Sequence, residues 1–300
     1  MFSGPFPVGS IGGQPVGVSS ILRLHDGRIA FLGGQSIPDN HGGATYTFHI
    51  SSDEGQSCPE SYAVGGQDGV YYVMNDRLIQ MSSGRLILMA SHMPAMSGAY
   101  EGYINVALCF YSDDGKRWKR SSQWSEIPGG GEGRGLQEAC AAEVAGGRLM
   151  MLARTGLGCL CRAWSDDGGD TWSPPEPTPL ASACSPLALK RVPDGRLMVV
   201  YNHAQPLCAG AFFPRTPMVY AVSVDEGQTW GEPFCIDPDG EEGKDRQNIY
   251  PSICFIEEGI LIVYSTLAAD PAGTFSNGGP DGWRLGGGKR CILAYPPIRR

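Results

Sequence analysis

Seven polar residues of this 300-residue chain lie beside short apolar segments and have side chains suited to anion binding or proton transfer. An arginine guanidinium is a planar fork of donors that fits a carboxylate, and two or three arginines together form an anion site. A tyrosine beside a glutamate can lose its proton to that carboxylate and act as a nucleophile. The seven residues are Asp76, Arg77, His92, Glu138, Arg154, Arg215 and Tyr250. They predict a pocket that holds an anionic group next to a Tyr–Glu pair.

A string of the form Ser-x-Asp-x-Gly-x-x-Trp recurs four times and predicts the turns of a repeated unit. Residues 165–172 and 223–230 are complete copies, residues 111–118 carry Tyr111 in the Ser position and Asp113 in the Asp position, and residues 51–58 end in Cys58. The Asp residues at 53, 113, 167 and 225 are 60, 54 and 58 residues apart, which indicates a repeated supersecondary structure. Asp can accept backbone N–H bonds and Gly supplies a positive φ, so each copy is expected to close a hairpin rather than to touch a ligand.

A second repeat alternates with the first. Its five copies, each an apolar strand, a Gly-containing turn and another apolar strand, lie at 21–32, 77–89, 142–152, 187–200 and 253–263. Four strands in each repeat are typical of a propeller blade. The sequence therefore predicts an all-β propeller that forms one domain over residues 1–300. Its five four-stranded blades are expected near 18–60, 71–120, 136–177, 184–236 and 249–297.

The order of strands within a blade decides which side chains can meet. If the strands are named A to D from the axis outward, the A–B turns and the Asp boxes lie at one end of the propeller. The starts of A, the ends of B and the starts of C lie at the other end, where long loops are also expected at 93–103, 124–137, 204–213 and 237–248. Long loops in a compact domain are usually either functional or disordered. All seven polar residues belong to this second end, so we expect them to converge in one axial pocket.

Charge and composition exclude several classes of partner. A net charge of −8 argues against nucleic acid and requires that any anionic ligand be held by a local cluster of arginines. The chain has no apolar run long enough to cross a membrane, and residues 1–5 do not resemble a signal peptide, which favours the cytoplasm. Ten cysteines without a C-x-x-C motif argue against a zinc ribbon and favour reduced thiols over disulfides. We expect no metal and no cofactor.

The boxes and the order of the polar residues resemble the sialidase (neuraminidase) superfamily, with its bacterial neuraminidase repeats. There a Glu opens one strand and an Arg closes the next, as Glu138 and Arg154 do here, a further Arg opens a later C strand, like Arg215, and a Tyr opens the last blade, like Tyr250. The resemblance covers residues 18 to about 265. It implies an exo-glycosidase for a terminal anionic sugar or glycan. In such an enzyme Glu138 would take the proton of Tyr250, and Arg154, Arg215 and Arg77 would hold the sugar carboxylate.

The chain also departs from that superfamily. Sialidases have six blades, and the first carries an Arg of the carboxylate-binding triad and the acid/base Asp. Only five repeats are visible here and the Phe/Tyr-Arg-Ile-Pro string is absent, so we expect the first blade of six to be missing and the acid/base role to fall to Asp76 or His92. A five-bladed ring with a rebuilt site, a truncated sialidase-like chain and a non-catalytic relative all remain open. The alternative functions are a carbohydrate-binding propeller without turnover and an enzyme for uronate-containing glycans that uses His as acid/base.

Overall fold

The computed structural model describes most of the chain, and almost all of its regular structure is antiparallel β-strand. The described residues are 10–11, 14–15, 17–36, 44–65, 70–93, 105–123, 125–127, 135–203, 215–236, 246–257, 259–268 and 285–294. A single turn of 3-10 helix, Ala145–Gly147, is the one helical element among them.

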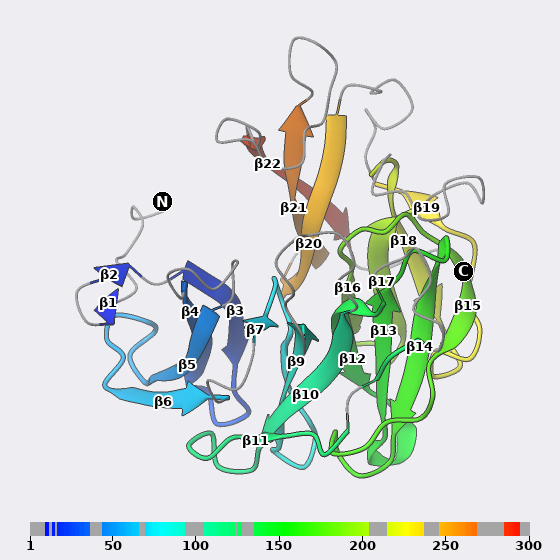
Figure 1. The fold of residues 1–300 in the computed structure, drawn as a ribbon. Helices are drawn as coiled ribbons and strands as arrows, with labels where there is room; N and C mark the ends of the chain where they lie inside the picture. Colours follow the sequence, from blue (N-terminus) through cyan, green and yellow to red (C-terminus); the bar gives the residue numbers. More distant parts are fainter. Residues whose placement is uncertain are drawn as a thin grey trace, which may run out of the picture.

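Four antiparallel sheets with four strand positions each follow one another along the chain (Figure 1). The first sheet contains β3 (Gly17–Arg23), β4 (Ile29–Ser36), β5 (Ala44–Ser51) and β6 (Glu60–Val64). The second contains β7 (Val70–Tyr72) and β8 (Leu78–Gln80), which both pair with β9 (Leu86–Met93), then β10 (Val106–Ser112) and β11 (Lys119–Arg120). The third contains β12 (Gln137–Glu143), β13 (Leu149–Arg154), β14 (Cys159–Ser165) and β15 (Glu176–Ala181). The fourth contains β16 (Ala188–Arg191), β17 (Leu197–Asn202), β18 (Met218–Ser223) and β19 (Phe234–Cys235).

A fifth sheet has three strands in the part of the chain that the structure describes, and a short pair precedes the first sheet. The fifth sheet is β20 (Arg246–Ile256), β21 (Gly259–Ala268) and β22 (Leu285–Ala294), and the pair is β1 (Ser10–Ile11) with β2 (Gln14–Pro15). Side chains of β3, β8, β12, β16 and β20, one strand from each of the five larger sheets, line one cavity of about 840 Å³, so these strands face a common axis. Sheets arranged radially in this way form a β-propeller, as predicted.

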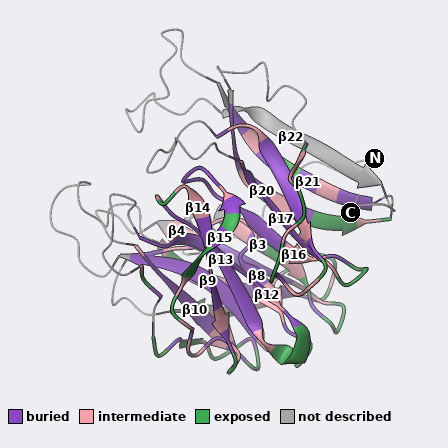
Figure 2. Ribbon diagram, turned by 90° about the vertical axis from the view of Figure 1, so that its right-hand side faces the viewer, coloured by how far each residue is buried: buried purple, intermediate pink, exposed green. Residues whose placement is uncertain are grey.

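Neighbouring sheets pack face to face because side chains alternate along each strand. In β9, Leu86, Leu88 and Ala90 pack against the first sheet, whereas Ile87 and Met89 pack against the third. Similar apolar clusters join the third sheet to the fourth and the fourth to the fifth. Figure 2 shows that the buried residues follow the strands of successive sheets. The core is therefore divided among the interfaces between sheets.

Each Asp box closes the hairpin between the third and fourth strands of its sheet. In the complete copy at residues 165–172, Ser165 Oγ donates to Asp167 Oδ1 at 2.9 Å, and Asp167 Oδ1 accepts the backbone N–H of Thr171 at 3.0 Å. Trp172 folds back over the turn, and its indole N–H donates to Gly169 O at 3.2 Å. The same Ser–Asp contacts recur in two other copies, at Ser51–Asp53 and Ser223–Asp225.

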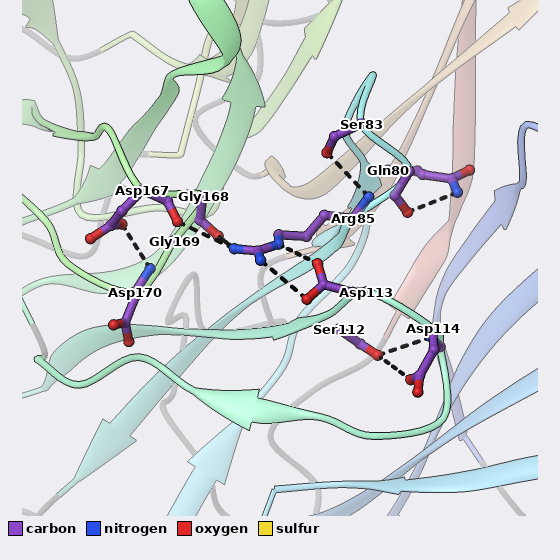
Figure 3. Close-up of polar contacts among 12 residues, drawn as sticks. Gln80, Ser83, Arg85, Ser112, Asp113, Asp114, Asp167, Gly168, Gly169 and Asp170 are labelled. Atoms are coloured by element: carbon purple, nitrogen blue, oxygen red, sulfur yellow. Dashed lines mark hydrogen bonds and ion pairs between the residues drawn. The ribbon is translucent and has the colours of Figure 1, made fainter.

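In the second sheet the box is one residue out of the predicted register. Ser112 Oγ donates to Asp114 Oδ1 at 3.2 Å, and Asp114 accepts two backbone N–H groups of its own turn at 2.8 Å (Figure 3). Asp113 instead accepts a hydrogen bond from Arg85 Nε at 2.6 Å. The assignment of Tyr111 and Asp113 to the box was wrong, because this turn is one residue shorter and the two adjacent Asp residues permit both alignments.

In three of the boxes, a glycine lies in close contact with the preceding sheet. Gly115, Gly169 and Gly227 all have positive φ, and a Cβ added at any of them would meet the preceding sheet. The nearest atoms there belong to Phe48 at 3.2 Å, Cys109 at 2.8 Å and, closer still, Met150. Gly55, at the same place in the first sheet, has nothing within 4 Å.

The two ends of the propeller differ as predicted. Arg85, in the turn between β8 and β9, donates to Asp167 O at 3.2 Å and Gly168 O at 3.3 Å, so an A–B turn and the next box share one end (Figure 3). Arg154 lies at the other end, because it ends β13, whereas the box residue Ser165 pairs with the start of that strand. The long loops predicted at the second end fall largely outside the described residues.

Three further findings concern the described residues alone. None of their helices is long and apolar enough to span a membrane. They contain no group of three or more His, Cys, Asp or Glu side chains that could hold a metal ion. The cysteines whose side chains are described there are free thiols.

Candidate functional site

Three residues near the starts of first strands have left-handed backbone although none is glycine. Asp76, Glu138 and Tyr250 have φ angles of 54°, 48° and 53°. Glu138 lies where β12 shifts register against β13, and Tyr250 lies where β20 shifts register against β21. Such bulges redirect a side chain away from the simple alternation of a strand, and each left-handed residue costs on the order of 1–3 kcal/mol. The backbone strain in these strands therefore falls on residues that the sequence singled out.

Glu138 and Arg154 form a buried ion pair at the end of β13. Arg154 Nη1 lies 3.2 Å from Glu138 Oε2, and Arg154 Nε donates to Gln137 Oε1 at 3.0 Å. The backbone N–H of Glu138 donates to Ser91 Oγ at 2.6 Å, which fixes the bulge against the second sheet. Burial is the largest single cause and would lower the pKa of Arg154, but the charges of Glu138, Cys184 and Tyr250 together raise it above its ordinary value.

Arg215 lies beside this pair and is held by its backbone. Asn202 Nδ2 donates to Arg215 O at 2.7 Å, the backbone N–H of Asn248 donates to the same oxygen at 3.0 Å, and Gln247 Oε1 accepts the Arg215 backbone N–H. The side chain is buried, and burial together with the charge of Arg154 lowers the pKa of Arg215. Two guanidinium groups therefore lie close enough to repel each other, which is the arrangement of an anion site.

Tyr250 is surrounded by four charged side chains. The charge of Glu138 is the largest cause of its raised pKa, and burial acts in the same direction. Arg154, Arg215 and Arg77 act in the opposite direction, because positive charges favour the phenolate. The structure thus brings Glu138, Arg154, Arg215 and Tyr250 close to one another.

Arg77 approaches Tyr250 from the interior. Its side chain is 1 % exposed, and its Nη1 donates to the carbonyl oxygens of Asn75 at 2.6 Å and Leu187 at 3.0 Å. Its Nε and Nη2 atoms are buried without a hydrogen-bond partner. This position between the second and fourth sheets does not favour the predicted contact of Arg77 with a sugar.

The structure directs Asp76 and His92 away from the cluster. Asp76 Oδ1 lies 2.7 Å from Lys190 Nζ, and Asp76 Oδ2 accepts the backbone N–H of Ile253 at 3.2 Å. His92 stacks on Tyr71, with ring centroids 4.7 Å apart, on the face of β9 opposite Ser91. Both placements argue against the predicted acid/base roles, because Asp76 forms an ion pair with Lys190 and His92 faces the first sheet.

Sequence reasoning missed Cys184. Cys184 is buried, and it lies close enough to Arg154 and Arg215 to act on the pKa of both guanidinium groups in the raising direction. Cys184 precedes the first strand of the fourth sheet, as Asp76, Glu138 and Tyr250 stand near the starts of other first strands, and that shared position is the signal that could have found it. The cluster as a whole can bind an anion between two arginines and present a phenol to a carboxylate.

Comparisons with known proteins give the fold a context. The family model described as BNR repeat-like domain matches residues 13–263. A comparison with curated proteins gave no match. Among solved structures, a protein of unknown function from Dyadobacter fermentans is similar with a TM-score of 0.63 and 20% identity, over 85% of this chain and 72% of that one.

Two sialidase structures share the fold at lower coverage of their own length. The leech intramolecular trans-sialidase, complexed with 2,7-anhydro-Neu5Ac, has a TM-score of 0.56 and 17% identity over 84% of this chain and 36% of that one. A variant of the NanB sialidase of Streptococcus pneumoniae has a TM-score of 0.56 and 19% identity over 77% of this chain and 33% of that one. The chain therefore spans about a third of the length of these sialidases.

Proposed function

The chain belongs to the family of BNR repeat-like domains, and on this premise we propose that it is an exo-glycosidase for a terminal sugar that bears a carboxylate, with sialic acid as the first class to test. One observation carries the proposal: the charge of Glu138 acts on the pKa of Tyr250, and the charges of Arg154 and Arg215 act on the same phenol, with Arg154 paired to Glu138. The sialic acid ligands named for similar structures, such as the 2,7-anhydro-Neu5Ac of the leech enzyme, support the choice of sugar.

The proposed reaction has two steps. Arg154 and Arg215 bind the sugar carboxylate through charge-assisted forks. The Tyr250 oxygen forms a bond to the anomeric carbon, the bond from that carbon to the leaving oxygen breaks, and Glu138 takes the phenolic proton. Glu138 then releases that proton to the departed oxyanion or to solvent. Water attacks the same carbon, the bond to Tyr250 breaks, and Glu138 relays one proton of the water to the Tyr250 oxygen, which restores the neutral phenol.

The architecture that we propose for the whole chain follows from the strands that line the axial cavity. We infer that β20–β22 are three strands of a fifth blade, because β20 lines the axial cavity together with the first strands of the four complete sheets. The ring would then hold five blades in a single domain over residues 1–300, one fewer than in the sialidase pattern.

A second candidate function is a carbohydrate-binding propeller without turnover. The observation that favours it is the placement of the two predicted acid/base residues: Asp76 forms an ion pair with Lys190, and His92 stacks on Tyr71. A leaving group of high pKa needs a proton from such an acid, whereas a phenolate leaving group does not. The two candidates therefore differ in which glycosides they would cleave.

The test compares an aryl sialoside, 3'-sialyllactose and an aryl glucuronide as substrates for the wild-type chain and for Tyr250→Phe. Tyr62→Phe is the matched control, because the Tyr62 hydroxyl bonds Glu60 on β6 and lies outside the cluster. We expect turnover of the aryl sialoside, its loss by about a thousandfold in Tyr250→Phe, and no change in Tyr62→Phe.

Each other result has a distinct meaning. Turnover that survives in Tyr250→Phe would overturn the nucleophile. Binding of sialic acid that Arg154→Met abolishes, without turnover of any glycoside, would establish the binding propeller. Preference for the glucuronide would move the substrate class to uronates.

A further inference from the structure

Arg77 carries a positive charge that its described contacts do not neutralise. Its guanidinium donates to two backbone carbonyl groups, and its backbone N–H donates to Ser20 Oγ at 2.9 Å. These partners are uncharged, and the neighbouring carboxylate, Asp76, is paired with Lys190. A guanidinium that is 1 % exposed and held by the first, second and fourth sheets cannot swing out to meet a ligand.

The segment that contains Arg77 is hydrogen-bonded to the segment that contains Tyr250. Asn75 Nδ2 donates to Pro251 O, directly after the tyrosine, and Asp76 Oδ2 accepts the Ile253 backbone N–H at 3.2 Å. Asp76 and Tyr250 both have left-handed backbone, so each side of this junction holds a strained residue in place. Arg77 is thus tied to the position of Tyr250 through the side chains of its neighbours Asn75 and Asp76.

The charges around Tyr250 change when a ligand binds. The groups that face it are Glu138 from β12, Arg154 from β13, Arg215 before β18 and Arg77 before β8. In the function proposed above, a sugar carboxylate occupies Arg154 and Arg215 and cancels much of their positive charge. Arg77 is 1 % exposed and does not bind the carboxylate in that function, so its positive charge is not cancelled.

We propose that Arg77 is a positioning residue, which holds the Tyr250 segment from the interior and supplies the positive charge that favours the nucleophile once a substrate carboxylate has neutralised Arg154 and Arg215. This inference rests on the proposed function. It assigns Arg77 to the phenol of Tyr250 instead of to the sugar.

The experiment measures kcat, KM and the ultraviolet titration of Tyr250 in Arg77→Lys and Arg77→Met. Spectra of the same variants with Tyr250→Phe are subtracted to isolate the phenol. Arg28→Met is the matched control, because Arg28 pairs with Asp26 in a turn at the opposite end of the propeller. In Arg77→Met we expect kcat for the aryl sialoside to fall about tenfold with KM unchanged, and Tyr250 to ionise at higher pH. Arg77→Lys keeps the positive charge, so its kcat and the pH at which its Tyr250 ionises should lie closer to those of the wild type.

The outcomes separate this inference from the proposed function. A rise in KM with kcat unchanged in Arg77→Met would overturn the positioning role and make Arg77 a substrate contact. If the wild-type chain cleaves no glycoside, the proposed function fails, and the titration still decides whether Arg77 acts on Tyr250. If Arg77→Met does not fold, the same comparison is made with Arg77→Gln and Arg77→Lys, and equal titration of Tyr250 in these two would overturn the inference.

Discussion

Among the single residues of the site, Glu138 has an unusual carboxylate. Its Oε2 atom lies 3.2 Å from Arg154 Nη1 but is buried without a hydrogen bond. Buried polar atoms are nearly always bonded, and an exception calls for an explanation. An oxygen with an unused lone pair beside a phenol is suited to accept a proton, which the proposed reaction requires of Glu138.

The pH dependence of Tyr250 tests this arrangement. Since the charge of Glu138 is the largest cause that raises the pKa of Tyr250, Glu138→Gln should lower that pKa, so the phenol ionises at lower pH than in the wild type. Turnover should nevertheless fall, by about a hundredfold, because the amide cannot take the proton. Ultraviolet titration measures the first effect and aryl sialoside kinetics the second.

Glu143→Gln is the control for this prediction. Glu143 ends the same strand β12, but its carboxylate bonds Ser82 at the box end of the propeller. A Tyr250 titration curve that moves as far in Glu143→Gln as in Glu138→Gln would contradict the assignment.

Part of this site could be predicted from the sequence. The ends of predicted strands placed Glu138, Arg154, Arg215 and Tyr250 at one end of the propeller, because inner strands meet at the axis. The direction of His92 and Asp76 could not be read in the same way. His92 follows the alternation of β9 toward the first sheet, and the left-handed Asp76 meets Lys190, a partner more than a hundred residues away along the chain.

At the scale of elements, the hairpins were readable from the sequence because each combines an apolar alternation with a Gly turn. The register of the second box was not, since Asp113 and Asp114 are adjacent. The backbone N–H groups of Arg117 and Lys116 are the main causes that lower the pKa of Asp114. Its contribution to stability is therefore present at neutral pH and is lost as the pH falls through the lowered pKa.

The box register predicts a difference between two neighbouring substitutions. Asp114→Ala removes the acceptor of two backbone N–H groups, so we expect a lower midpoint of thermal unfolding at pH 7. Asp113→Ala removes only an exposed contact with Arg85 and should change the midpoint less. Thermal unfolding followed by circular dichroism checks the order, and the reverse order would restore the register predicted from the sequence.

The box glycines predict a second pair of matched variants. Both Gly227 and Gly55 have positive φ, so alanine strains the backbone by about 1 kcal/mol at either site. Only at Gly227 does the new Cβ also meet the preceding sheet, at Met150, which adds about 2 kcal/mol of overpacking. Denaturant unfolding should show Gly227→Ala to be the less stable variant, and equal losses would mean that the box does not clamp neighbouring sheets.

Over the whole molecule, the segment of residues 75–77 joins several sheets at the axis. Asp76 pairs with Lys190 of the fourth sheet and accepts a bond from Ile253 of the fifth, while its backbone N–H donates to Ser19 O of the first at 3.1 Å. These contacts cross the axis and supplement the packing between neighbouring sheets. The repeats gave no sign of them, because they arise from single residues that differ from blade to blade.

The ion pair at the axis, whose Lys190 and Asp76 side chains are 14 % and 10 % exposed, can be tested by a double-mutant cycle. Lys190→Met leaves the Asp76 carboxylate without its cation and should lower the free energy of unfolding by about 3 kcal/mol. Asp76→Asn suits the left-handed backbone and should restore part of that loss when combined with Lys190→Met. Additive losses in the double variant would show that the two side chains do not interact.

The axial junction also fixes when the pocket can form during synthesis. Asn75 and Asp76 bond Pro251 and Ile253, partners 176 and 177 residues later in the chain. At roughly 5–20 residues per second, about 10–35 s separate the emergence of the two segments from the ribosome. The first four sheets can pack one after another during that interval, since each contacts its neighbour in sequence. Tyr250 is the last of the four cluster residues to emerge, so the nascent chain acquires its phenol–carboxylate pair only after the first four sheets have been made.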